Sequence, residues 1–171
     1  MLIGIFTLSS ALCRAESDAI THNFNEMASA GTLNFPDRPD SYAVGVTDQV
    51  TYTGSNGGGF GLDATRYCIS LPKNGVMQMS PAIADLTRIQ LLHTLGAVPE
   101  KSKVKVYIST DNSTWTDISA TAYYTKNNID APVPVKGNYY VKLTNTGNTT
   151  INFLSVVYVY ESCRCLRVVI N

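Results

Sequence analysis

The sequence predicts an all-β domain, an antiparallel β-sandwich of the jelly-roll type, from three observations. Apolar and polar residues alternate in several short segments, and this period of two is typical of strands with one buried face. Turn signals made of Gly, Pro, Asn and Asp separate the segments at nearly regular spacing. The 171 residues include ten Tyr and 12 Gly, which favours short strands joined by turns, because aromatic side chains suit a pleated surface.

The length and the charge of the chain restrict its class. A chain of 171 residues is long enough for one domain with a full core and too short for two ordinary domains. The 13 basic residues balance the 13 acidic ones, so the formal net charge is zero. The strongly basic surface of a nucleic-acid-binding protein is therefore missing, and we expect no nucleic-acid partner.

Residues 1–15 are predicted to be a secretory signal peptide. Apolar residues predominate between Leu2 and Leu12, and Cys13 and Ala15 place small residues at the cleavage positions. No Lys or Arg precedes the apolar stretch, so a buried N-terminal strand is the alternative. Because no segment has the length needed to span a bilayer, we expect an exported protein, secreted or at the cell surface, without a membrane span.

Residues 16–160 are expected to form the sandwich. Its central feature is a hairpin over residues 104–118, in which a strand of alternating residues breaks at the polar turn 110–113 and resumes at Trp115. Residues 19–33 are expected to contribute a first strand followed by one helical turn.

Further strands are expected where short alternating segments lie between turn signals. Pro72-Lys73-Asn74-Gly75 is one such signal, so residues 67–80 are predicted to form a second hairpin. The expected strands span residues 50–53, 67–71, 76–80, 89–91, 104–108, 133–135, 139–143 and 151–160.

Two segments depart from the alternating pattern. Pro132 and Pro134 place residues 133–135 at a sheet edge, because proline has no N–H to donate to a ladder. Residues 54–61 are expected to be a flexible glycine-rich loop. Residues 161–171 follow the last expected strand as a C-terminal tail whose role is open.

Three cysteines remain once the predicted leader is removed, namely Cys68, Cys163 and Cys165. An odd number cannot all pair within one chain, so at least one thiol is free or bridges outward. A disulfide from Cys68 to Cys163 or to Cys165 stays open, because spacing alone does not establish a pairing.

No catalytic motif accompanies the reactive residues. His22 and His93 are the only histidines, no known hydrolase motif surrounds them, and His93 is interpreted as a partly exposed histidine at a strand end. The glycines of residues 54–61 lack the Gly-Lys-Ser/Thr end of a phosphate loop. We expect no catalytic residue and no cofactor, although carboxylates in the loops could hold a structural calcium ion.

Side chains opposite the predicted buried faces form a candidate ligand-binding set. Aromatic and cationic residues together suit an acidic sugar polymer, since Tyr stacks on sugar rings and Arg or Lys meets carboxylates. The alternative is an ordinary solvated face stabilised by cross-strand pairs. Trp115, the only tryptophan, is favoured as a core residue that locks the hairpin onto the opposite sheet, with a sugar platform as its alternative role. The candidate contacts are Arg88, Lys105, Tyr107, Trp115, Tyr140 and Lys142.

Three stretches resemble a known class of module. Residues 108–118, I-S-T-D-N-S-T-W-T-D-I, are similar to the strand-turn-Trp signature of carbohydrate-associated β-sandwich modules. Residues 67–81 and 152–160 resemble jelly-roll modules in exported proteins of gut Bacteroidetes, which are often appended to pectate-lyase-like enzymes. The likeness covers about residues 20–160. It implies a non-catalytic module with polysaccharide as its ligand and a catalytic domain or another protein as a further partner.

Three functions follow, in order of preference. The first is a non-catalytic carbohydrate-binding module of an exported bacterial protein, with a polysaccharide, acidic and pectin-like, as ligand. The second is a structural or adhesive surface domain that contacts protein. The third is a polysaccharide lyase or hydrolase with an unrecognised site.

Overall fold

The computed structural model describes residues 12–29, 45–46 and 50–166, and it describes side chains over residues 15–29 and 50–162. Most of the predicted signal peptide lies outside these residues. No helix in this part of the chain is long and apolar enough to cross a membrane.

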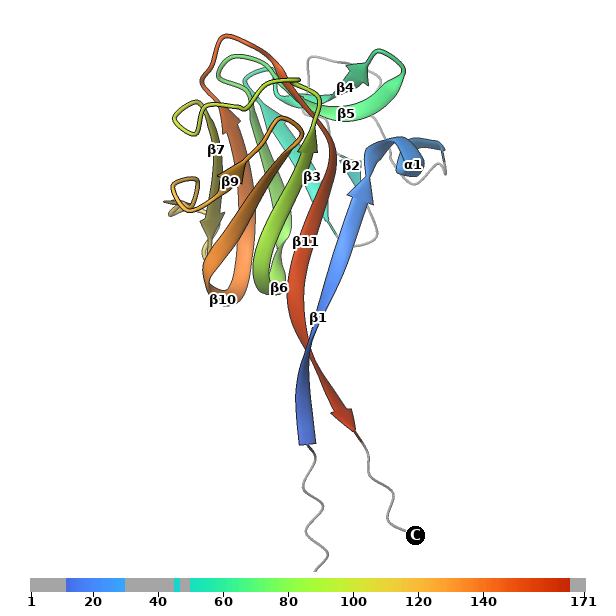
Figure 1. Ribbon diagram of the computed structural model, residues 1–171, viewed down its shortest axis with the longest axis vertical. Coiled ribbons are helices and arrows are strands. Elements are labelled where there is room, and N and C mark those ends of the chain that lie inside the picture. Colours follow the sequence, from blue (N-terminus) through green and yellow to red (C-terminus); the bar gives the residue numbers. More distant parts are fainter. Residues whose placement is uncertain (1–11, 30–44, 47–49, 167–171) are drawn as a thin grey trace, which may run out of the picture.

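The domain is an all-β antiparallel sandwich, as the alternation of the sequence predicts. Every strand pair is antiparallel, and one sheet curls so that its two halves face each other (Figure 1). The elements are β1 (Leu12–Asn23), α1 (Phe24–Ser29), β2 (Gly45–Val46), β3 (Thr51–Ser55), β4 (Gly59–Asp63), β5 (Arg66–Leu71), β6 (Val76–His93), β7 (Val104–Ser109), β8 (Thr116–Asp117), β9 (Tyr123–Tyr124), β10 (Asn128–Asn145) and β11 (Ile151–Leu166).

Two long strands, β6 and β10, belong to both halves of the sandwich. They pair from Val76 opposite Thr144 to Leu92 opposite Asn128, with register shifts between, and both fold back at the lower edge of the sandwich body in Figure 1, above the projecting β1–β11 ribbon. Strands β3 and β7 extend the half that contains the start of β6 and the end of β10, which we call the first layer. Strands β11 and β9 extend the other half, the second layer.

Irregular backbone allows this bend. The register between β6 and β10 shifts between Pro132 and Val141, and Asp85 has a positive φ of 50° while its N–H donates to Asn138 Oδ1 over 3.1 Å. Pro134 lies within the shifted segment, where the ladder is interrupted, so its missing N–H removes no paired hydrogen bond. Residues 133–135 are thus part of β10 rather than a separate short strand, and no strand of the described residues pairs with β10 there on the side away from β6, as the predicted edge position requires.

The structure also corrects three other expectations. Residues 76–80 and 89–91 are parts of the single strand β6 rather than two strands. The turn at residues 72–75 is present, with Gly75 N–H donating to Pro72 O over 2.8 Å, but β11 lies between β5 and β6. The predicted hairpin over residues 67–80 is therefore wrong. Instead, β5 pairs with β4, which occupies part of the expected glycine-rich loop.

The hydrophobic core fills the space between the layers. Alternate residues of each strand point inward, as the pleat of a strand requires, and α1 adds the fully buried ring of Phe24. The helical turn expected near residues 19–33 is α1. Inward residues with no exposed surface include Met77, Met79, Ile89, Leu91, Val106, Ile129, Val141, Phe153 and Val156.

A polar cluster in the core joins β1 to both layers. The His22 ring lies with its centroid 5.6 Å from those of Tyr52 and Tyr158. The Tyr158 hydroxyl donates to the Tyr52 hydroxyl over 3.2 Å, and the Tyr52 hydroxyl bonds His22 Nδ1. Burial lowers the pKa of His22 to about 4, so this imidazole is neutral at pH 7.

Strands β1 and β11 form a ribbon that projects beyond the body of the sandwich in Figure 1. Beyond Tyr160, β11 pairs with β1 alone, and the register places Cys13 opposite Cys165. The ribbon crosses the predicted leader boundary after Ala15 and the predicted domain end at residue 160. The leader and the tail remain predictions.

Candidate functional site

Strand register gathers aromatic and cationic residues on the outer surface of the first layer. Lys142 of β10 lies opposite Gln78 of β6 on one side and opposite Tyr107 of β7 on the other. Tyr107 is in turn opposite Asp117 of β8. The hairpin predicted over residues 104–118 is thus confirmed as β7 and β8. We call the surface formed by Gln78, Lys105, Tyr107, Trp115, Asp117, Tyr140 and Lys142 the outer face.

Lys142 is the centre of the outer face. Its Nζ lies 4.1 Å from the centroid of the Trp115 ring and 5.0 Å from that of Tyr107. Desolvation lowers the pKa of this ammonium group, and the electron-rich faces of the two rings stabilise its charge. Trp115 is half-buried at this position and is not part of the hydrophobic core. The favoured interpretation of Trp115 as a core residue is therefore wrong.

The turn before Trp115 explains how this ring is held. Asp111 Oδ1 accepts hydrogen bonds from the N–H groups of Thr114 and Ser113, over 2.7 and 2.9 Å, and from the Ser109 hydroxyl over 2.9 Å. These donors, the backbone groups first, hold the pKa of Asp111 well below its usual range. A short acidic side chain that bonds the following backbone is the typical origin of such a turn.

The tip of the same turn is tied back to the sheet. Asn112 adopts a positive φ of 60°, which asparagine tolerates better than most residues. Its Oδ1 accepts a hydrogen bond from Gln78 Nε2 over 2.7 Å. Since Gln78 is opposite Lys142, the turn, the sheet and the Lys142 cluster form one connected surface.

An ion pair borders the aromatic cluster. Lys105 Nζ lies 2.7 Å from Asp117 Oδ2, and the two side chains are 30% and 35% exposed. The hydrogen bond to Asp117 raises the pKa of Lys105. Partial burial acts to raise the pKa of Asp117, but hydrogen bonds from Lys105 and Ser119 outweigh it and lower that pKa. Both groups are charged at neutral pH.

The structure brings together five of the six predicted contact residues. Tyr140 is on the same surface as Lys142, two residues earlier in β10 and opposite Ser109. Arg88 is elsewhere, because β6 passes into the second layer before reaching it. Its guanidinium lies 3.3 Å from Asp130 Oδ2. The outer face therefore contains Lys105, Tyr107, Trp115, Tyr140 and Lys142 without Arg88.

Sequence reasoning did not identify the residues that support this surface. Asp117 neutralises Lys105, Asp111 and Asn112 fix the turn, and Gln78 connects the turn to the sheet. The available signal was the polar run of residues 110–113, which predicted a turn but not its contact with β6.

The described histidine and cysteine candidates for chemistry lie outside the outer face. His93 is buried rather than partly exposed, and its ring nitrogens contact Thr125 O at 3.2 Å and the Leu95 N–H at 3.3 Å. Cys68 is a buried free thiol whose pKa burial raises to about 11. Within residues 12–29, 45–46 and 50–166, no group of three His, Cys, Asp or Glu side chains is placed to hold a metal ion.

The fold and the outer face define an all-β antiparallel sandwich with an exposed aromatic and cationic surface. No protein-family model matches the chain, and no curated protein matches it. Among solved structures, the chain is similar to the crystal structure of CapF with the inhibitor 3-isopropenyl-tropolone, with 14% identity and a TM-score of 0.24. The match covers 71% of this chain and 31% of CapF. A TM-score this low carries no argument about fold or function.

Proposed function

We propose that this domain is a non-catalytic carbohydrate-binding module of an exported protein and that its ligand is an acidic, pectin-like polysaccharide. The observation that carries the proposal is the outer face, where Lys142 lies between Trp115 and Tyr107. Both aromatic rings and the ammonium group remain partly accessible to solvent.

The chemistry of the outer face matches both parts of a uronic acid unit. A sugar ring presents a patch of C–H groups that packs on an aromatic side chain, as other apolar groups do. Its carboxylate accepts charge-assisted hydrogen bonds from ammonium groups. Lys142 supplies the cation, while Tyr107, Tyr140 and Trp115 supply apolar surface with polar edges.

The surface is also held in place before a ligand arrives. The Asp111 turn and the Gln78 to Asn112 hydrogen bond fix the approach to Trp115, and strand pairing fixes Tyr107 and Lys142. A preorganised surface loses less conformational freedom on binding. A partly exposed surface that spans β7 and β10 suits a polymer that lies across several strands.

Affinity electrophoresis of the full chain tests the proposal. Gels that contain polygalacturonate should retard the protein, and gels that contain a neutral glucan should retard it less. The double variant Tyr107→Ala with Tyr140→Ala should lose most of the retardation, because it removes two aromatic contacts. Tyr123, which is 70% exposed on β9, provides the control Tyr123→Ala, which should bind like the wild type.

Two results would contradict the proposal. If no polysaccharide retards the wild type, the module does not bind glycans of these classes. If the double variant is retarded as strongly as the wild type, binding occurs elsewhere on the molecule. Circular dichroism and thermal unfolding of each variant establish that it is folded before its mobility is compared.

A further inference from the structure

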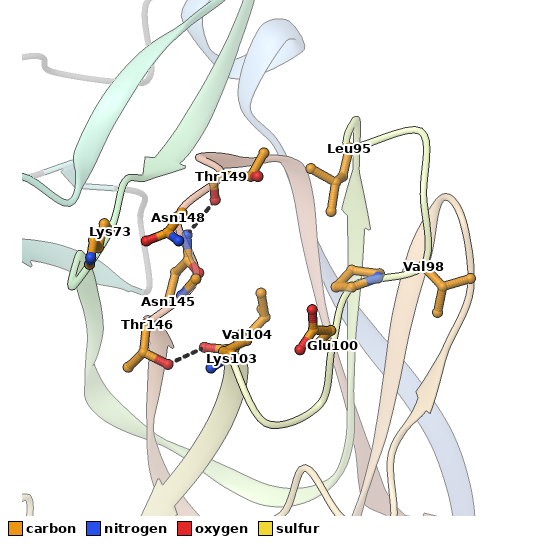
Figure 2. A pocket seen from close by; sticks show the side chains of 12 residues that line it. Lys73, Leu95, Val98, Glu100, Lys103, Val104, Asn145, Thr146, Asn148 and Thr149 are labelled. Atoms are coloured by element: carbon orange, nitrogen blue, oxygen red, sulfur yellow. Dashed lines mark hydrogen bonds between the residues drawn. The ribbon is translucent and has the colours of Figure 1, made fainter.

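A separate cleft lies at the end of the sandwich where three connections meet. Its volume is about 510 Å³, within the range of roughly 300–1,000 Å³ that small-molecule sites occupy. One wall is the β10–β11 turn, with Asn148 and Thr149, and the other is the β6–β7 connection, with Val98 and Glu100 (Figure 2). Lys73, from the turn before β6, also lines it. We call this cleft the end pocket.

Asn145 fixes the β10–β11 wall of the end pocket to the β5–β6 turn. This buried side chain donates to Leu71 O and Thr149 O, each over 2.8 Å, and accepts from the Gly147 N–H over 2.8 Å. Its backbone N–H donates to Gly75 O over 3.0 Å. All the hydrogen-bonding groups of the amide are thus used to hold the β5–β6 and β10–β11 turns in position.

The third connection is held in the same way. The backbone N–H and the hydroxyl of Thr146 both donate to Lys103 O, over 2.8 and 3.3 Å. The N–H groups of Lys103 and Val104 donate to Glu100 O over 2.9 and 3.0 Å. The pocket therefore has a defined shape without a ligand, which reduces the entropy that binding costs.

The charged side chains of the end pocket have no ion-pair partner in the described part of the chain, unlike four of the cations elsewhere on the surface. Lys105, Arg88, Lys136 and Arg66 each form an ion pair with a carboxylate. Among the described residues, no ion pair engages Lys73, Lys103 or Glu100. Two cations and one anion leave the pocket with one net positive charge, and Figure 2 shows the Glu100 carboxylate between the two walls.

From this arrangement we infer that the end pocket is a second binding site, which takes a single carboxylated sugar unit. Lys73 and Lys103 attract the carboxylate, and Glu100, Asn148 and Thr149 exchange hydrogen bonds with hydroxyl groups. Val98, which is 54% exposed, provides an apolar surface for the C–H side of the ring. The presence of Glu100 disfavours ligands with two negative charges.

This inference goes beyond the proposed function, because the end pocket shares no residue with the outer face. A monosaccharide in the end pocket would affect the amides of that pocket, whereas a polymer on the outer face would affect strands β7 and β10. The two sites can therefore be tested separately, and failure of one leaves the other standing.

Chemical-shift titrations of the ¹⁵N-labelled full chain test the end pocket with three probes. Galacturonate has the carboxylate and the hydroxyls, galactose has only the hydroxyls, and acetate has only the carboxylate. Galacturonate should shift the amides of Lys103 and Gly147 saturably, while galactose and acetate should bind at least roughly tenfold more weakly, as expected when a charge-assisted contact or several hydrogen bonds are lost.

Matched lysine variants locate the interaction. Lys73→Met and Lys103→Met should each weaken galacturonate binding roughly tenfold, and both should fold, because neither side chain forms an ion pair among the described residues. Lys126→Met, at an exposed lysine outside the pocket, should bind like the wild type. The inference would be overturned if acetate bound as tightly as galacturonate or if galacturonate gave no saturable shift. It would also be overturned if Lys126→Met weakened galacturonate binding as much as the two pocket variants do.

Discussion

Two clusters in this domain have the same arrangement of groups but differ in burial. In the core, the imidazole of His22 lies between the rings of Tyr52 and Tyr158. On the outer face, the ammonium group of Lys142 lies over the rings of Trp115 and Tyr107. Each cluster places one basic group against two aromatic rings.

Burial determines what each cluster can do. Desolvation lowers the pKa of both basic groups, but His22 begins near neutrality and is almost fully enclosed. It is therefore neutral at pH 7 and forms part of the core. Lys142 begins at 10.5 and is only partly enclosed, so it keeps its charge and can meet a ligand. The first cluster should matter for stability and the second for binding.

Acidification should have the largest effect on stability, because it protonates the His22 cluster. The folded-state pKa of His22, about 4, lies below its ordinary value of 6.5, so the unfolded state takes up the proton first. Stability is then fully present above pH 6.5 and falls as the pH decreases toward 4, by up to about 3 kcal/mol. Urea unfolding at a series of pH values measures this loss.

The variant His22→Phe separates this effect from other titrations. It should flatten the dependence of the free energy of unfolding on pH between 6.5 and 4, whatever its stability at pH 7. A weaker slope should remain from His93, whose pKa burial also lowers. An unchanged slope in His22→Phe would show that the imidazole is not the group that responds.

Local patterns in the sequence predicted the fold class, but they did not predict that β6 is one continuous strand. Alternation identified β7 because one face of this strand is buried along its length. The same alternation rule predicted two strands in place of β6, because Pro81 and Asp85 interrupt the pattern. The strand continues through them because β10 shifts its register to follow the bend, and no short stretch of sequence contains that information.

The outer face was predictable to the extent that it lies within one layer. Lys105, Tyr107 and Lys142 were assigned correctly to an outward surface, because a single alternation covers each strand there. Arg88 also points outward but from the second layer, since β6 has already passed the bend. Every assignment that crossed the bend required the three-dimensional structure.

The end pocket also could not be predicted from local sequence patterns. Lys73, Glu100 and Asn148 each lie in a turn or connection that the sequence predicts. Their convergence depends on Asn145, whose side chain reaches Leu71 across 74 residues of sequence, and on Thr146, which bonds Lys103 O. Turn signals give the location of each connection along the chain and say nothing of which connections meet.

Loss of the Asp111 carboxylate should have an intermediate effect, directed at the outer face. Asp111→Ala removes the acceptor of the Thr114, Ser113 and Ser109 hydrogen bonds, so the turn before Trp115 should loosen. We expect a melting temperature lower by a few degrees and weaker retardation by polygalacturonate. Asp111→Asn, which keeps a carbonyl acceptor, should retain most of both properties. Normal binding by the alanine variant would mean that the turn does not position Trp115 for the ligand.

Neutralising Lys142 should have the smallest effect on stability, and this outcome sharpens the contrast with His22. Lys142→Met keeps an unbranched side chain against Trp115 and Tyr107 and removes only the charge. Because exposed cation–π contacts contribute about 0.5–1 kcal/mol, urea unfolding should show a loss of no more than about 1 kcal/mol, with an unchanged dependence on urea concentration. Lys142→Arg keeps the cation and should be close to the wild type. If Lys142→Met instead destabilised the protein as strongly as acidification of the His22 cluster, the ammonium group would be a structural element rather than a charge available to ligands, and the distinction between the two clusters would fail.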